Sequence, residues 1–186
     1  MQNPYREATP FATPDGPTSS TAAEIHERAT LVDHYAWAIP TTDAVDFITQ
    51  HGPMLEIGAG RGYWAWCIDQ RGGDIIATDI DPPRDPWYPV ERLDARDAVD
   101  TYRERTVILC CPETDQRWPT DALDHIDNEL VALVGPRPHP TTELHHRLES
   151  EWLCIGSRRI PTFFGQPHHV RIYRNTTWNT DQTFDC

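Results

Sequence analysis

An acidic residue followed by alternating glycines is the pattern in this chain best suited to contact a ligand. Glu56 lies in a short apolar run, and glycines follow it at every second position: Gly58, Gly60 and Gly62. Because glycine has no Cβ, such positions can take positive φ angles and let the backbone approach a ligand closely. A second apolar run over residues 73–79 ends in another carboxylate, Asp79. The order strand, glycine loop, helix, strand and acid predicts a nucleoside-binding βαβ unit.

The glycine spacing separates two kinds of nucleoside cofactor. A dinucleotide fingerprint has the form Gly-x-Gly-x-x-Gly, which seats a pyrophosphate on the helix N-terminus. This chain has Gly-x-Gly-x-Gly, with Tyr63 and Trp64 at the start of the expected helix. The pattern resembles the class I S-adenosylmethionine-dependent methyltransferases, whose cofactor carries no phosphate. A nicotinamide-dependent oxidoreductase stays open as an alternative, because it uses the same order of strand and acid.

The resemblance implies a role for each residue of the motif. In that family the acid before the first glycine lies near the methionine amino group, and the acid ending the second strand accepts hydrogen bonds from both ribose hydroxyls. Glu56 and Asp79 hold these places. Asp94 and Ala95 match the family's acid and small residue against the adenine, although Asp94 is equally suited to cap a helix. The implied cofactor site consists of Glu56, Gly58, Ala59, Gly60, Gly62, Asp79, Ile80, Asp94 and Ala95.

Two aromatic residues upstream of the glycine loop, Tyr35 and Trp37, are candidates for the substrate side of the site. An aromatic face attracts a cation such as a sulfonium, so either ring is suited to lie over the cofactor or to wall the substrate pocket. The alternative is that both rings pack an N-terminal helix onto the sheet.

The resemblance extends to an uncharacterised branch of methyltransferase-like proteins from microbes and fungi, and it covers most of residues 30–175. Members of that branch usually carry Trp-Pro-Pro-Tyr-Asp after the fourth strand, a loop that faces the transferred methyl group. This chain has Cys-Cys-Pro-Glu-Thr-Asp over residues 110–115, so Cys111 and Pro112 are the methyl-facing candidates. The usual Gly-Glu pair after the fifth strand is also replaced, by Gly135-Pro136. These departures leave open a non-catalytic binding or regulatory module.

Methyl transfer asks mainly that a nucleophile be held in line with the methyl group and that a proton be removed where the nucleophile carries one. Glu113, Asp115 and His169 are equal candidates for that base, so the sequence assigns no catalytic residue. The tetrapeptide of amino-methyltransferases (Asp or Asn, Pro, Pro, aromatic) is absent, and methylation of a nucleobase amino group is therefore not supported.

The composition indicates the solvent conditions and the kind of partner that suit the protein. The chain has 186 residues and a formal net charge of −13 at pH 7, and its sixteen basic Lys and Arg residues are all arginines. An acid excess without lysine is typical of halophile proteins, so we expect a source that lives in high salt. Clustered cations drive nucleic-acid binding, and the sequence has no such cluster beyond Arg158-Arg159. The expected partner is a methyl acceptor, either a small molecule or a protein.

An odd number of cysteines argues against a disulfide framework. The five are Cys67, Cys110, Cys111, Cys154 and Cys186. Cys-x-x-Cys does not occur, and the adjacent histidines at 145–146 and 168–169 have diverging side chains, so no metal site is expected. Neither a leader peptide nor an apolar run of about eighteen residues is present, which predicts a cytoplasmic protein without a membrane span.

The length suits one α/β domain with a substantial core. Residues 1–20 are rich in Pro, Thr and Ser and predict a flexible N-terminal tail; residues 21–175 are expected to form a single methyltransferase-like domain including N-terminal helices, and residues 176–186 a C-terminal tail. Besides the βαβ unit, the periodicity predicts helices over 22–37, 41–50, 121–126 and 142–149, and strands over 106–111, 130–135, 152–157 and 170–174.

Alternating strands and helices imply a mostly parallel sheet covered on both faces, a Rossmann-like three-layer sandwich of about seven strands. The last two predicted strands have no helix between them, so one of them should run antiparallel. That ending is the class I methyltransferase arrangement and differs from the standard dinucleotide fold.

Overall fold

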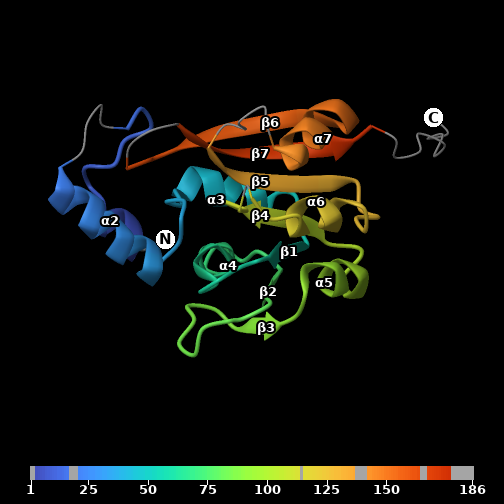
Figure 1. The fold of residues 1–186 in the computed structure, drawn as a ribbon, viewed down its shortest axis with the longest axis horizontal. Helices are drawn as coiled ribbons and strands as arrows, with labels where there is room; N and C mark the ends of the chain where they lie inside the picture. Colours follow the sequence, from blue (N-terminus) through green and yellow to red (C-terminus); the bar gives the residue numbers. More distant parts are fainter. Residues whose placement is uncertain (1–2, 17–20, 114, 137–141, 164–166, 177–186) are drawn as a thin grey trace.

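The order of the strands determines where a ligand can bind. The structure is a computed structural model that describes residues 3–16, 21–113, 115–136, 142–163 and 167–176. Over these residues the strands form one seven-stranded sheet in the order β3-β2-β1-β4-β5-β7-β6 (Figure 1). The order reverses between β1 and β4, and the crevice outside the strand ends at such a reversal is the usual ligand position in open α/β sheets.

Parallel and antiparallel pairing divide the sheet as predicted. The parallel strands are β1 (Met54–Ile57), β2 (Ile75–Asp79), β3 (Val90–Arg92), β4 (Thr106–Cys110) and β5 (Leu130–Pro136). The strand β7 (His168–Asn175) runs antiparallel both to β5 and to β6 (Trp152–Ile160). Parallel neighbours need a crossover of a dozen or more residues, and the connection from β6 to β7 is shorter than that. The expected antiparallel strand near the C-terminus is confirmed.

Helices cover both faces of the sheet, which confirms the three-layer α/β sandwich. The residues of α3 and α4 pack into the core on one face, and those of α5, α6 and α7 into the core on the other (Figure 1). Most of α2 is exposed, and it lies at the left of the view. The bounds are α2 (Ala22–His34), α3 (Thr42–Thr49), α4 (Tyr63–Asp69), α5 (Ala95–Thr101), α6 (Trp118–Leu123) and α7 (Glu143–Glu151).

Alternating side chains of β1 supply the two cores. Met54 packs with residues of α3 and α4, whereas Leu55 and Ile57 pack with residues of α5 and α6. Successive side chains of a strand point to opposite faces, so Glu56 shares the α4 face with Met54. Its carboxyl group is thereby buried against the first turn of α4, where the backbone N–H of Ala65 donates a hydrogen bond to it.

Two predicted helices differ from the structure by about one turn. The helix expected over 121–126 begins earlier, at Trp118, and has Pro119 in its first turn, a position where proline fits because its missing N–H would have no helical partner. The helix expected over 22–37 ends at His34. As a result, Tyr35 and Trp37 lie after α2, in the connection to α3.

The N-terminal segment is folded, and the expectation of a flexible tail over residues 1–20 is wrong for residues 3–16. The segment forms α1 (Pro4–Ala8), whose Tyr5 is fully buried. The Tyr5 ring stacks on Tyr35 with a centroid distance of 4.6 Å, and Thr13 bridges Thr162 next to β6. The Pro- and Thr-rich composition indicated a tail, but buried aromatic contacts hold the segment on the domain. The expectation for residues 1–2 and 17–20 lies outside the described residues, as does nearly all of the expected C-terminal tail.

Replacement of Tyr5 by phenylalanine should lower the free energy of unfolding by about 1 to 2 kcal/mol, because the Ala36 carbonyl loses its partner. The Tyr5 hydroxyl donates a 2.8 Å hydrogen bond to that carbonyl. Urea unfolding measures the change, and Tyr102→Phe is the matched control, since its hydroxyl contacts Glu91 at an exposed position. If both substitutions lower the free energy of unfolding equally, the hydrogen bond from Tyr5 to Ala36 stabilises the protein no more than an exposed one does.

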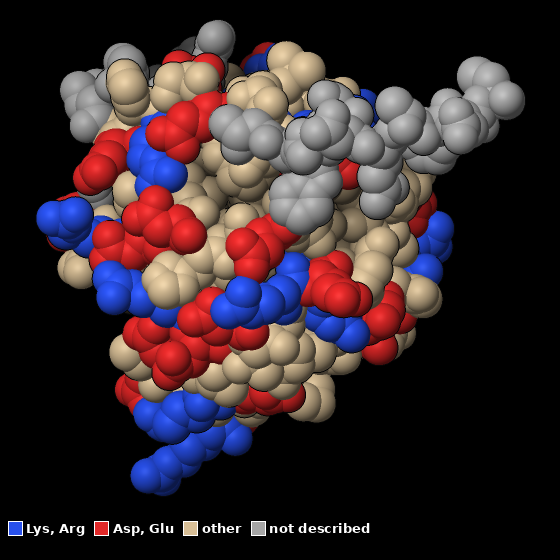
Figure 2. All heavy atoms as spheres, turned by 90° about the vertical axis from the view of Figure 1, so that its right-hand side faces the viewer, with Lys and Arg blue, Asp and Glu red and all other residues tan. Residues whose placement is uncertain are grey.

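The surface combines carboxylates with arginines. On the face that carries α5, α6 and α7, red and blue side chains are interleaved (Figure 2). Arg103 contacts Asp100 at 2.9 Å and Asp127 at 2.7 Å, and Arg147 contacts Asp124 at 2.6 Å. Exposed pairs of this kind contribute little to stability individually. None of the helices in the described part of the chain is long and apolar enough to cross a bilayer.

Candidate active site

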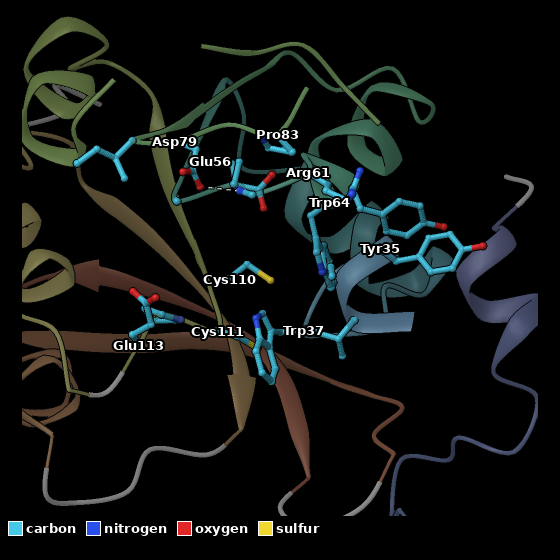
Figure 3. A pocket seen from close by; sticks show the side chains of 18 of the residues that line it. Tyr35, Trp37, Glu56, Arg61, Trp64, Asp79, Pro83, Cys110, Cys111 and Glu113 are labelled. Carbon is cyan, nitrogen blue, oxygen red and sulfur yellow. Dashed lines mark hydrogen bonds between the residues drawn. The ribbon is translucent and has the colours of Figure 1, made fainter. Parts of the chain in front are cut away.

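A cavity of about 760 Å³ lies where the strand order reverses, at the carboxyl ends of β1, β2 and β4. Figure 3 shows Glu56 and Asp79 on one side of it and Trp37, Cys111 and Glu113 on the other. Every residue of the predicted cofactor site except Gly62 lines this cavity, and Gly62 caps the helix that follows. The four candidates for the substrate or methyl-facing side line it as well: Tyr35, Trp37, Cys111 and Pro112.

The glycine loop passes close to a bulky ring and needs glycine at its first position. Gly58 has a φ of 65°, and a Cβ placed there would lie 2.8 Å from the indole of Trp118. The next glycine, Gly60, has a φ of 54°, and a Cβ there would meet nothing within 4 Å. Position 58 therefore requires glycine both because Trp118 lies so close and because of its backbone angle. At position 60 only the backbone angle favours glycine, since there is free space for a side chain.

Asp79 holds the glycine loop in place. Its Oδ2 accepts a 2.8 Å hydrogen bond from the backbone N–H of Gly60, and its Oδ1 accepts one of 2.8 Å from that of Asp81. An ionised carboxylate offers about four acceptor positions, so acceptor capacity is left on the side of the cavity. Ile80, the next residue, is 68% exposed and lines the same cavity. The site thus combines a hydrogen-bond acceptor with an apolar contact surface.

Glu56 is buried, 2% exposed, and its Oε2 accepts a 3.0 Å hydrogen bond from the backbone N–H of Ala65. Burial raises the pKa of Glu56 to about 8, the Ala65 N–H opposes that rise, and the nearby charge of Asp79 adds to it. At neutral pH this carboxyl group is therefore mostly protonated. A cationic group placed beside it would favour the charged form.

Asp94 caps a helix and also lies at the cavity. Its side chain accepts a hydrogen bond from the backbone N–H of Arg96 and so caps α5. It also lines the cavity, together with Leu93 and Ala95. The cap fixes the position of the carboxylate at the cavity rim.

Arg61, between the second and third glycines, is engaged by the protein. Its Nε donates to the carbonyl of Asp33 at 2.7 Å, and its guanidinium donates to the carbonyl and the carboxylate of Asp85 at 2.9 Å. These contacts connect the last turn of α2 to the segment between β2 and β3. Arg61 thereby fixes a wall of the cavity.

Tyr35 and Trp37 have different surroundings. Tyr35 lies in an aromatic cluster, stacked on Tyr5 at 4.6 Å and on Trp87 at 5.4 Å, so the packing interpretation describes most of its contacts. Trp37 is 57% exposed at the cavity, and the guanidinium of Arg28 lies 5.4 Å from its ring centroid. Of the two, Trp37 has the accessible aromatic face.

The loop after β4 brings one of the three candidate bases to the cavity. Glu113 lines it, and its Oε2 accepts a 2.9 Å hydrogen bond from the indole N–H of Trp118. Asp115 borders a smaller neighbouring cavity of about 140 Å³, and His169 lies on β7. Neither of these two is among the described residues lining the main cavity.

Sequence reasoning missed Trp118 and Trp64 as cavity residues. Trp118 lies over Gly58, and Trp64, whose indole N–H donates to the Ala38 carbonyl at 3.0 Å, forms part of the cavity wall. The Trp-Pro pair that begins α6 was the available signal for Trp118, because proline at a first helical position marks a helix start. No local pattern indicates that its ring would reach the glycine loop.

Comparison with solved structures places the fold. The chain is similar to a 1,6-didemethyltoxoflavin-N1-methyltransferase of Burkholderia thailandensis, with a TM-score of 0.55 and 15% identity over 87% of this chain and 93% of that one. It is also similar to the magnesium protoporphyrin IX methyltransferase of Synechocystis PCC 6803, with a TM-score of 0.53 and 12% identity over 92% and 89% of the two chains. No protein-family model and no curated protein sequence matches the chain. The fold is the Rossmann-like fold of the class I methyltransferases.

Proposed function

We propose that this protein is an S-adenosylmethionine-dependent methyltransferase that works in the cytoplasm on a small molecule or a protein. The observation that carries the proposal is the convergence of Glu56, the glycine loop and Asp79 around one cavity at the strand reversal. The comparison structures support it, since both are methyltransferases and were solved with S-adenosylmethionine or S-adenosylhomocysteine bound.

The residues present fit such a cofactor. Asp79 offers a carboxylate with acceptor capacity for ribose hydroxyls, and the exposed side chain of Ile80 lies beside it for the adenine. Glu56 provides a buried carboxyl group for the methionine amino group. The only chemistry that the cofactor supplies is an activated methyl group; the protein has to bind it, exclude water and orient the acceptor.

The acceptor side of the cavity is mostly apolar, with an exposed indole. Trp37 and Pro112 line this side, and Glu113 is its available proton acceptor. The hydrogen bond from Trp118 holds the Glu113 carboxylate in place, which suits a positioned base. Orientation by these walls, with proton removal by Glu113, is the contribution we assign to the chain.

Replacement of Asp79 by alanine should weaken binding of S-adenosylhomocysteine by about 1 to 3 kcal/mol, roughly 5- to 150-fold, the usual cost of removing a charged hydrogen-bond partner. Calorimetric titration in molar salt, where a halophile protein is expected to be folded, measures the change. The matched control is Asp81→Ala, because Asp81 is an exposed acid two residues away that pairs with Arg92. Unchanged affinity in Asp79→Ala would show that the acid is misassigned.

A non-catalytic binding module is the second candidate, and the loop after β4 favours it. In this loop the chain has Cys-Cys-Pro-Glu-Thr-Asp over residues 110–115, where the related branch usually carries Trp-Pro-Pro-Tyr-Asp. Such a module would bind the cofactor without consuming it. Transfer of labelled methyl groups to any component of a cell extract would exclude this candidate.

A further inference from the structure

Two adjacent thiols face the cavity at the end of β4, and the proposed methyl transfer requires neither of them. Cys110 and Cys111 both line the cavity, and both are free cysteines. As neighbours in the chain they have Cα atoms about 3.8 Å apart. Figure 3 shows Cys110 directed into the cavity, with Cys111 and Trp37 on the side opposite Asp79. The pair is therefore accessible to a ligand that enters the cavity.

A left-handed residue ends β4 at the second cysteine. Neighbouring side chains on a strand normally point to opposite faces, but Cys111 has a φ of 47°, and among the described residues it alone combines a side chain with a positive φ. Gly135 on β5 leaves room for this arrangement, since a Cβ there would lie 3.3 Å from the Cys111 Sγ. Backbone strain of this kind concentrates at functional sites.

We infer that Cys110 and Cys111 form a dithiol site for a trivalent, thiophilic metalloid of the arsenic(III) type. Sulfur is a soft ligand that selects soft, thiophilic elements. A trivalent arsenical that keeps one substituent of its own needs only two sulfur donors. Zinc needs four ligands, and the described residues include no group of three or more His, Cys, Asp or Glu side chains that could hold a metal ion.

The surroundings of the pair fit a ligand with an apolar substituent. The wall around the pair is largely apolar and includes Trp37, Trp64 and Pro112, which suits an aryl substituent on the arsenic.

The binding reaction balances without an oxidant. With phenylarsine oxide as the probe, two As–S bonds form, the arsenic–oxygen bond is broken, and both thiol protons leave with that oxygen as one water molecule. Arsenic stays trivalent and sulfur is not oxidised. The inference does not depend on S-adenosylmethionine binding, because the two thiols alone carry it.

Titration with phenylarsine oxide, followed by mass spectrometry and by counting of free thiols, tests the site. We expect one arsenical per chain, the loss of two titratable thiols, and an adduct that resists excess monothiol but is released by a small dithiol. Cys110→Ser and Cys111→Ser should each weaken binding by about 100-fold or more, because the second bond then becomes intermolecular or is lost. Cys154→Ser is the matched control, since Cys154 is an exposed cysteine on β6, and it should bind as the wild type does.

Alkylation and peptide mapping of the wild-type protein keep the test valid even where a serine variant fails to fold. The peptide that contains Cys110 and Cys111 should be protected from iodoacetamide by the arsenical, and the peptide that contains Cys154 should not. Absence of a two-thiol adduct, or a two-thiol adduct that persists in Cys110→Ser, would overturn the inference. Binding of S-adenosylhomocysteine, measured on the same sample, reports separately on the proposed function.

Discussion

Gly58→Ala should lower the free energy of unfolding by about 2 to 4 kcal/mol and abolish measurable cofactor binding. Part of this cost is the backbone, because an L-residue held at a left-handed φ costs about 1 to 2 kcal/mol. The rest is steric, since the added Cβ would lie 2.8 Å from the Trp118 indole. To make room the ring must move, which disturbs its hydrogen bond to Glu113.

Two variants separate the backbone cost from the steric cost in urea unfolding. Gly72 has a φ of 78°, and a Cβ there would meet nothing within 4 Å. Gly72→Ala should therefore lower the free energy of unfolding only by the cost of the left-handed backbone angle. In a Trp118→Ala background the cost of Gly58→Ala should fall to that same level, because interacting sites are not additive. If the cost of Gly58→Ala is the same with and without the Trp118 ring, the ring does not restrict the glycine loop.

The features that the sequence predicted well are those in which chemistry and position are coded locally. Glu56, the glycines and Asp79 lie within one βαβ unit, so their spacing alone places them at neighbouring strand ends. The mostly parallel sheet and its antiparallel ending followed from the pattern of helices between strands, because a parallel pair needs a long crossover. The ligand of those residues is argued from the chemistry of the site and not from the fold.

The features that the sequence did not predict depend on contacts between distant segments. Tyr5 is buried because Tyr35 and Tyr63 surround its ring, and no periodicity within residues 1–20 reports that contact. Trp118 lies far along the chain from Gly58, yet its ring lies 2.8 Å from where a Cβ on residue 58 would be. The turn that ends β4 depends on a single left-handed residue, Cys111, and a cysteine gives no sequence signal for a backbone angle of that kind.

Glu56→Gln should make the protein more stable than the wild type in alkaline solution and change its stability little in acid. Burial raises the pKa of Glu56 to about 8 in the folded protein, from an ordinary value of 4.5. The folded state therefore binds this proton more tightly than the unfolded state does. The contribution of Glu56 to stability is fully present below about pH 4.5, declines as the pH rises toward 8, and is constant above that.

Each pKa unit corresponds to about 1.4 kcal/mol. The free energy of unfolding that depends on the Glu56 proton is therefore roughly 3 to 5 kcal/mol over the whole pH range. The amide side chain of the Glu56→Gln variant would keep an oxygen for the Ala65 N–H and carry no charge, which removes the pH dependence at this site. Urea unfolding of both proteins at pH 5, 7 and 9 in molar salt measures the difference. Parallel pH profiles would mean that Glu56 titrates normally and is not the buried acid described above.

The same titration should couple to ligand binding if the cofactor's amino group lies beside Glu56. A cation there stabilises the ionised carboxylate, so binding at neutral pH must release the Glu56 proton. Affinity for S-adenosylhomocysteine should therefore rise with pH up to about 8 in the wild type, where the pKa of Glu56 lies, and this increase should be missing in Glu56→Gln. Calorimetry in two buffers of different ionisation enthalpy detects the released proton directly. If the wild type binds the ligand without releasing a proton, the amino group of the ligand does not lie beside Glu56.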